Sequence, residues 1–252
     1  MNKLALVLYV VLLMLPFEGL SAFGGLSAEL ADDPHPNLTQ HIPECAADGD
    51  LSAVSIIEAI EVKDEDVYTG YGTAFLVEGG WWISAAHVVA PSFATNDKHI
   101  VHLYTDDDER IPATIVHIDL DTDIAILTAD YKPKPLPIST RELKKEDLVH
   151  TSGFPHFSGD VRQTYSGGYI GATDSGGLLT DSFVFSGMSG GPGLICTDDT
   201  LEVFGVISSY TAWYRRIPLT LDGVDYSHKT ERVSGESIIE PNIQQHVDAI
   251  DK

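Results

Sequence analysis

Three prolines within five residues constrain this chain more than any other local feature. Pro133, Pro135 and Pro137 stand in the run Tyr131-Lys132-Pro133-Lys134-Pro135-Leu136-Pro137. Proline fixes φ and lacks the backbone N–H that an inner strand must donate, so this run favours extended polyproline geometry. We therefore expect residues 131–140 to connect two structural halves.

On both sides of this connection the sequence has the pattern of an antiparallel β protein. Short β-rich runs alternate with Gly and Asp turns, and no helical period persists between them. Strands are expected at 72–77, 81–84, 99–104, 113–118 and 124–127, and then at 148–152, 161–170, 181–185 and 203–209. This spacing predicts a sandwich or a barrel. One helix is expected at Pro241–Ile250, where Ile243, Val247 and Ile250 share a face.

The first fifty residues differ from this pattern. Lys3 precedes the apolar run Leu4–Phe17 and the small residue Ala22, which is the order of a cleavable secretory signal at 1–22. The run is short for a membrane span, although an uncleaved anchor is the alternative. Residues 23–50 form an irregular extension. The first β half is then expected at 51–130, the second at 141–215, and a C-terminal segment with the helix at 216–252.

Charge and cysteine content narrow the possible functions. The chain of 252 residues has a formal net charge of −23, which repels phosphate backbones and excludes nucleic acid as an expected partner. No segment after the signal is apolar enough for stable membrane insertion. Cys45 and Cys196 predict one disulfide in a secreted or periplasmic protein, with two free buried thiols as the alternative. The acidic run 106–109 lacks EF-hand spacing and is expected to be a solvated hairpin loop, so no metal site or cofactor is expected.

The segment Gly187-Met188-Ser189-Gly190-Gly191-Pro192 is an unusual setting for a serine. A serine hydroxyl is a weak nucleophile unless a base is adjacent. The candidate base is His87, which ends an apolar run and two alanines; the alternative is a core histidine satisfied by a hydrogen bond. The candidate orienting carboxylate is Asp123, which leads directly into an apolar strand; the alternative is simple turn chemistry. Together the three segments predict a Ser-His-Asp site.

These segments, with Gly70–Val77 upstream, resemble the trypsin/chymotrypsin superfamily of serine endopeptidases. The resemblance covers residues 52–212 and is strongest to bacterial HtrA-like and glutamyl-endopeptidase-like members, with the same order of His, Asp and Ser. It implies an all-β fold of two six-stranded antiparallel barrels with the active site in the cleft between them. It also implies that His87 is the base, that Asp123 orients it, and that Ser189 attacks a peptide carbonyl. The N–H groups of Gly187 and Ser189 would then form the oxyanion hole.

Several residues near Ser189 differ from those that members of the superfamily have at the same positions. Met188 stands where digestive members carry an Asp that pairs with a newly freed N-terminus, so this activation is not expected. The strand after Ser189 lacks the histidine of glutamyl-specific members. Phe183 replaces the Asp of trypsin-like pockets, although Asp181 is close enough for a shifted loop to supply it. We expect a pocket bounded by Phe183, Ser208, Ser209 and Tyr210 that favours small or medium apolar residues. The segment after the second half is too short for a PDZ domain.

Two other functions fit parts of this pattern. Gly-x-Ser-x-Gly is also the nucleophile elbow of α/β-hydrolases, but that fold places Asp and His after the serine and alternates helices with strands. A catalytically idle trypsin-fold protein that binds a partner is the other alternative. The expected function is a secreted serine endopeptidase that cleaves proteins or peptides through an acyl-enzyme, without a cofactor.

Overall fold

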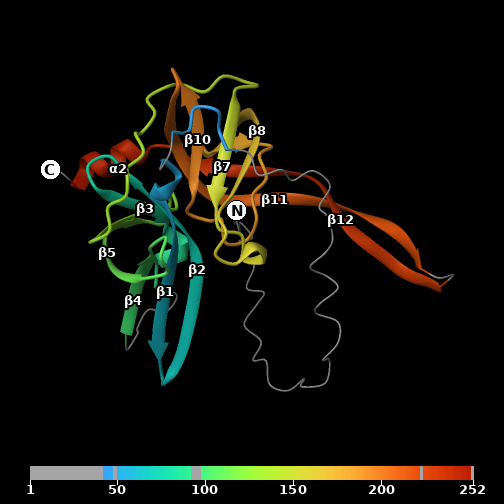
Figure 1. Ribbon diagram of the computed structural model, residues 1–252, viewed down its shortest axis with the longest axis horizontal. Helices are drawn as coiled ribbons and strands as arrows, with labels where there is room; N and C mark the ends of the chain where they lie inside the picture. Colours follow the sequence, from blue (N-terminus) through green and yellow to red (C-terminus); the bar gives the residue numbers. More distant parts are fainter. Residues whose placement is uncertain (1–41, 48–49, 92–97, 222–223, 251–252) are drawn as a thin grey trace, which may run out of the picture. The chain divides into compact units, whose positions relative to one another are not determined.

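The computed structural model describes residues 42–47, 50–91, 98–221 and 224–250, with the backbone alone for 157 and 212–235. The expected signal at 1–22 and most of the extension at 23–50 lie outside the described residues. The described chain forms two closed antiparallel barrels of six strands each (Figure 1). The all-β prediction with two six-stranded barrels is confirmed.

The first barrel follows a short 3₁₀ turn at Asp50–Ala53. Its strands pair in the order β1-β2-β3-β6-β5-β4. They are β1 (Val54–Lys63), β2 (Asp66–Val77), β3 (Trp81–Ala85), β4 (Lys98–Tyr104), β5 (Arg110–Asp119) and β6 (Ile124–Ala129). The core is densest where β2, β3 and β6 meet, because Phe75, Trp82 and Ile126 are fully buried there. Strand β1 was not expected from the sequence, and β2 extends beyond the expected 72–77 to pair with it.

The second barrel pairs its strands in the order β10-β11-β12-β9-β8-β7. They are β7 (Leu148–Gly153), β8 (Gln163–Ala172), β9 (Leu178–Thr180), β10 (Pro192–Thr197), β11 (Thr200–Leu221) and β12 (Val224–Glu240). The barrel is therefore completed by β12, and the expected limit at residue 215 is wrong. The sequence of β12 is rich in charged and polar residues and lacks the apolar runs from which most of the other strands were predicted.

The expected strand at 181–185 is also wrong, because the sheet strand β9 ends at Thr180. The Asp181 carboxylate accepts the backbone N–H of Gly168 at 2.6 Å, and the buried Ser182 hydroxyl donates to the Tyr165 carbonyl. The chain thus leaves the sheet at this point. Residues 181–191 run as an irregular segment that leads to β10.

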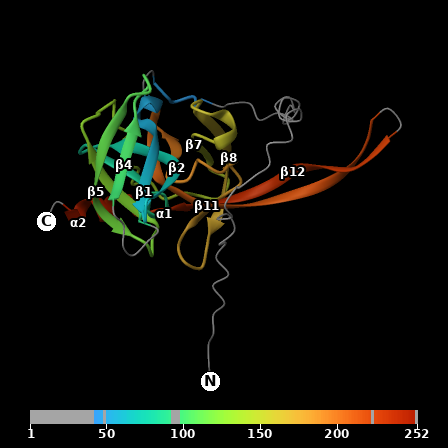
Figure 2. The same cartoon turned by 90° about the horizontal axis from the view of Figure 1, so that it is seen from below.

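The outer part of β11 and β12 is a two-stranded ribbon. Its pairing runs from Thr211↔Glu236 to Leu221↔Val224, while β9 and β10 pair only with the inner parts of the two strands. Figures 1 and 2 show the two strands lying side by side along this ribbon.

The proline-rich segment joins β6 to β7 and contacts both barrels. Leu136 is buried and exchanges backbone hydrogen bonds with Leu76 and Glu78 of the first barrel. Ser139 N–H donates to the Val203 carbonyl of the second barrel at 2.7 Å, and Val203 N–H donates to the Pro137 carbonyl at 2.9 Å. The segment is thus extended, as its prolines predict, and it is fixed along its length.

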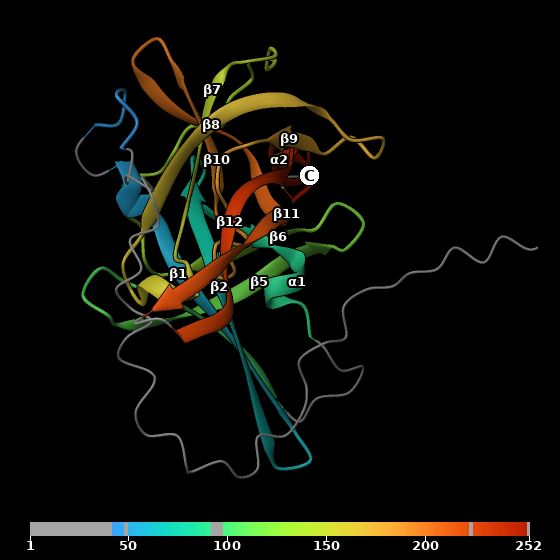
Figure 3. The same cartoon turned by 90° about the vertical axis from the view of Figure 1, so that its right-hand side faces the viewer.

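A disulfide joins Cys45 to Cys196, as predicted, and ties the segment before β1 to β10. The expected C-terminal helix is α2 (Ile243–Ile250), which buries Ile243 and Val247. The short helix α1 (Ala86–Val89) follows β3 directly and lies beside β6 (Figure 3). Among the described residues, no helix has the length and apolar character that crossing a membrane requires.

Candidate active site

Helix α1 carries His87 out of the core of the first barrel. The side chains of Ala85 and Ala86 are fully buried, and the Ala86 N–H donates to the Asp123 carbonyl at 3.0 Å. Small side chains permit this close backbone approach between β3 and the turn before β6. The His87 side chain is 49% exposed. The alternative of a core histidine is therefore wrong.

The turn that ends at Asp123 holds its carboxylate against His87. Asp123 has φ of 53°, a left-handed conformation that Asp tolerates better than most residues. One carboxylate oxygen, Oδ1, accepts the His87 backbone N–H at 2.9 Å, and Oδ2 lies 2.8 Å from His87 Nδ1. Oδ2 also accepts the hydroxyl of Ser208 at 2.6 Å. Asp123 thus makes tertiary contacts with both barrels, which simple turn chemistry does not explain.

These contacts set the charge of Asp123. Burial raises the pKa of the Asp123 carboxyl. The hydrogen bonds from His87 and Ser208 and the attraction to His87 lower this pKa by a larger amount, so the net pKa lies below the ordinary value. The carboxylate is therefore ionised near neutral pH. An ionised Asp123 favours the histidine tautomer with its proton on Nδ1, which leaves the lone pair on Nε2 available as a base.

Ser189 lies in a turn of the second barrel that is pressed against the first. Its carbonyl accepts the Thr73 N–H from β2 at 2.8 Å, and the Thr73 hydroxyl donates to the Gly187 carbonyl at 2.8 Å. Gly190 has φ of 84°, and a Cβ there would collide with the Thr73 carbonyl and the Ser84 hydroxyl. The glycine after the serine is thus required by close packing on β2 and β3.

The segments of the three predicted residues contact one another, although not every predicted hydrogen bond is made. A Cβ on Gly190 would lie 2.7 Å from the backbone nitrogen of Ala85, two residues before His87. A Cβ on Gly72 would lie 2.7 Å from the Val88 side chain and 2.9 Å from the Ser189 carbonyl oxygen. Helix α1 and the serine turn therefore both pack against Gly72, and there is no room for a side chain at this position. In the described part of the chain, hydrogen bonds join His87 to Asp123, and none joins His87 to Ser189.

Two backbone N–H groups of the turn around Ser189 have no hydrogen-bond acceptor among the residues that the structure describes. The Ser186 carbonyl accepts the His156 backbone N–H at 2.9 Å. Because C=O and N–H point in opposite directions in a trans peptide, the Gly187 N–H faces away from His156. Within the described residues, neither the Gly187 nor the Ser189 N–H donates to an acceptor.

His156 was not recognised from the sequence. It begins the 3₁₀ turn His156–Ser158, and a Cβ on Gly187, which has φ of 97°, would lie 2.6 Å from its Cδ2 atom. No motif in the sequence signals this contact, because it joins two loops about thirty residues apart. The loop after β7 thus fixes the conformation of the turn before Ser189.

The residues expected to bound the substrate pocket lie in two segments, the irregular segment before Ser189 and strand β11. Phe183 is half-buried, stacks on Phe185 with ring centroids 6.2 Å apart, and meets the buried Tyr165 edge-on at 6.4 Å. The Ser208 hydroxyl binds Asp123, so that this side chain orients the carboxylate instead of facing a substrate. The Ser208–Asp123 contact was not anticipated. Ser209 and the exposed Tyr210 follow on β11.

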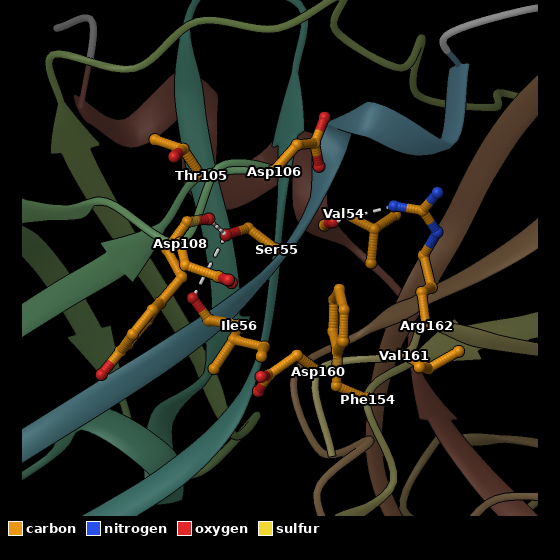
Figure 4. A pocket seen from close by; sticks show the side chains of 11 residues that line it. Val54, Ser55, Ile56, Thr105, Asp106, Asp108, Phe154, Asp160, Val161 and Arg162 are labelled. Atoms are coloured by element: carbon orange, nitrogen blue, oxygen red, sulfur yellow. Dashed lines mark hydrogen bonds between the residues drawn. The ribbon is translucent and has the colours of Figure 1, made fainter. Parts of the chain in front are cut away.

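A cavity of about 400 Å³ lies between β1 and the loop after β7 (Figure 4). Its walls carry Asp106, Asp108 and Asp160, together with Arg162, whose guanidinium donates to the Val54 carbonyl at 3.4 Å. An adjoining cavity of about 390 Å³ shares Phe154 and Asp160 and reaches Gly72 and His156. The 106–109 run is thus an exposed turn between β4 and β5, as expected, and two of its carboxylates line this groove.

Comparisons with known proteins agree with the fold. A family model described as trypsin-like peptidase domain matches residues 72–206, which is more than half of the chain and includes His87, Asp123 and Ser189. No curated protein matches the sequence. The solved structures that match include the active form of the Rv3671c protease from M. tuberculosis, at 20% identity and a TM-score of 0.55. That match covers 79% of this chain and 82% of the other. Antiparallel barrels exclude the α/β-hydrolase alternative, which needs helices alternating with strands.

Proposed function

Because the chain belongs to the trypsin-like peptidase family, we propose that it is a secreted serine endopeptidase whose nucleophile is Ser189. The observation that carries the proposal is the contact of both Asp123 carboxylate oxygens with His87, beside a glycine turn that presents a serine. A base with a fixed tautomer is what a serine hydroxyl requires to become a nucleophile. The substrates are proteins or peptides.

The proposed reaction proceeds in two halves. Ser189 Oγ attacks the peptide carbonyl while His87 Nε2 takes the hydroxyl proton, and the Gly187 and Ser189 N–H groups stabilise the oxyanion. The imidazolium then gives its proton to the departing amine, which leaves an acyl group on Ser189. Water enters and attacks the acyl carbonyl while His87 takes one of its protons. The bond between the acyl carbon and Ser189 Oγ then breaks, His87 returns the proton to Oγ, and the acyl group leaves as a carboxylic acid. Asp123 remains ionised throughout and stabilises the imidazolium. Because no hydrogen bond joins His87 to Ser189 in the described chain, this contact is expected to form when substrate binds.

The disulfide supports the proposed secretion. A disulfide between Cys45 and Cys196 is typical of an oxidising compartment, such as the periplasm or the exterior of the cell. The apolar run at residues 4–17 would supply the export signal.

We infer further that the proposed pocket prefers small or medium apolar residues before the cleaved bond. Phe183 presents an aromatic surface without a charge at the position where a basic-specific pocket needs a carboxylate. A set of peptides that differ only at this residue tests the preference by kcat/KM. A clear preference for Arg, Lys or Glu would overturn it.

Labelling with a fluorophosphonate probe tests the nucleophile. The mature protein should label at Ser189, and the Ser189→Ala and His87→Ala variants should not, whereas Ser175→Ala in the β8–β9 turn serves as the matched control and should label. Circular dichroism establishes that each variant is folded. A folded protein that does not label would overturn the proposal and favour the catalytically idle, partner-binding alternative.

A further inference from the structure

A cluster of two histidines and one aspartate lies where the C-terminal helix contacts the first barrel. His117 and Asp119 belong to β5, and His246 belongs to α2. One ligand atom of each residue lies within 4.8 Å of those of the other two. His117 Nε2 and His246 Nδ1 are 3.3 Å apart, and His246 Nδ1 lies 4.0 Å from Asp119 Oδ2. All three side chains are partly buried.

His117 Nε2 and His246 Nδ1 are hydrogen-bond partners of each other, so a metal ion would replace this contact, while other hydrogen bonds hold the remaining polar atoms of Asp119 and His246. The other oxygen of Asp119, Oδ1, accepts the backbone N–H groups of Asp121 and Thr122 at 2.9 and 3.2 Å. This fixes the carboxylate with Oδ2 toward His246. Thr122 Oγ1 lies 3.2 Å from His246 Nε2. In the tautomer with its proton on Nε2, His246 donates to Thr122 and has its lone pair on Nδ1. Outer hydrogen bonds of this kind hold and orient metal ligands.

The spacing of the two imidazole nitrogens matches a tetrahedral metal site. With Zn–N bonds of about 2.0–2.1 Å, two ligand atoms on a tetrahedron are about 3.3–3.4 Å apart. The observed 3.3 Å between the histidine nitrogens fits this value. The 4.0 Å between His246 Nδ1 and Asp119 Oδ2 exceeds it by about 0.7 Å, so the Asp119 carboxylate would have to move closer when the ion binds. We propose that His117 Nε2, Asp119 Oδ2 and His246 Nδ1 bind one divalent transition metal ion, Zn²⁺ by preference, with water as the fourth ligand.

The donor set determines the class of metal. Two imidazoles and one carboxylate suit Zn²⁺ and neighbouring transition metals, whereas Mg²⁺ and Ca²⁺ prefer oxygen ligands alone. No sequence motif predicts this site, because 129 residues separate His117 from His246 and only the fold brings them together. The proposal does not depend on proteolytic activity.

The position of the site suggests its role. Asp119 and Thr122 belong to the same turn as Asp123, which holds His87. A metal ion bound by Asp119 and His246 would fasten α2 to this turn and limit its movement. The ion would thus link α2 to the turn that carries Asp123, next to the candidate active site.

Calorimetric titration of the mature protein with Zn²⁺ tests the site. Wild-type protein should bind one Zn²⁺, and Asp119→Asn or His246→Gln should weaken binding at least tenfold. Even changes to residues that only hydrogen-bond to a metal ligand weaken binding about 10- to 100-fold. Asp121→Asn is the matched control, because Asp121 lies on the same turn with an exposed side chain. This variant should bind as the wild type does.

Two further readouts separate a built site from surface binding. Bound Co²⁺ should give the visible absorption of a tetrahedral complex in the wild type and the Asp121→Asn variant, but not in the other two. Saturating Zn²⁺ should raise Tm in the same two proteins only. No measurable binding, or binding that is equal in all four proteins, would overturn the proposal. Since Asp119→Asn changes one half-exposed side chain, a folding failure of His246→Gln would still leave the test decisive.

Discussion

The Ser208 hydroxyl donates to Asp123 Oδ2 at 2.6 Å, and the same oxygen lies 2.8 Å from His87 Nδ1. Ser208 belongs to β11 of the second barrel, whereas Asp123 ends the turn between β5 and β6 of the first. The orientation of the candidate base is therefore set by residues from both barrels. Ser208 acts through Asp123 and is a positioning residue.

Replacing Ser208 should reduce turnover more than substrate binding. A hydrogen bond to a charged group is worth about 1.5–3 kcal/mol, so Ser208→Ala should lower kcat about 10- to 100-fold with little change in KM. Steady-state kinetics on a peptide substrate measure both constants. Ser208→Thr keeps the hydroxyl and should restore most of the rate. A rise in KM alone would show that Ser208 lines the pocket instead.

The lowered pKa of Asp123 predicts how stability depends on pH. Because the folded carboxyl has a pKa below its ordinary value of 3.8, the unfolded chain binds the proton more readily. The stabilisation is complete above the ordinary pKa and is lost as the pH falls through the lower folded value. The difference in unfolding free energy between the protein and its Asp123→Asn variant should thus be constant above about pH 5 and shrink below it. Urea unfolding in a Ser189→Ala background avoids self-cleavage, and a difference that stays constant down to pH 3 would contradict this prediction.

Gly190→Ala should destabilise the protein and abolish labelling. The left-handed φ of 84° is unfavourable for alanine, and the new methyl group would meet the Thr73 carbonyl, the Ser84 hydroxyl and the Ala85 nitrogen. We expect a loss of roughly 2–4 kcal/mol in unfolding free energy. Gly171→Ala is the control, because no atom lies within 4 Å of a Cβ there. Equal stability of the two variants would show that the serine turn does not require glycine.

Removing the disulfide should weaken the fold substantially. The bridge joins residues 151 positions apart, and the chain-entropy model gives a stabilisation of about 4–5 kcal/mol for a loop this long. The double variant Cys45→Ser, Cys196→Ser should unfold at a correspondingly lower urea concentration. Wild-type protein with its disulfide reduced should behave in the same way. If both forms unfold at the same urea concentration as the oxidised protein, the bridge does not restrict the unfolded chain.

Local sequence patterns predicted most strands, because a buried strand has a short apolar run bounded by turn residues such as Gly and Asp. Strand β1 escaped recognition because Glu58 and Glu61 interrupt its apolar pattern. Glu58 is only 1% exposed, and its carboxylate is satisfied by the Tyr71 and Tyr104 hydroxyls and the Arg110 guanidinium. A buried carboxylate with three donors from other strands has no signature in one strand alone.

The candidate active site likewise contains residues that the local sequence marks and residues that only the fold reveals. His87, Asp123 and Ser189 each stand in a distinctive local setting, so the sequence alone could nominate them. Ser208 and His156 act through contacts with distant segments, and nothing in their own surroundings marks them. Ser208 and His156 are therefore found only once the fold is known, whereas Asp123, which orients His87, is marked by its own local sequence.

The extended segment between the barrels bonds to the first barrel through Leu136 and to Val203 of the second through Pro137 and Ser139. Buried residues of both barrels also belong to one continuous apolar cluster, which includes Leu136. Bonds to both barrels, together with the shared apolar cluster, resist movement of one barrel relative to the other. Either barrel expressed alone would leave apolar surface uncovered.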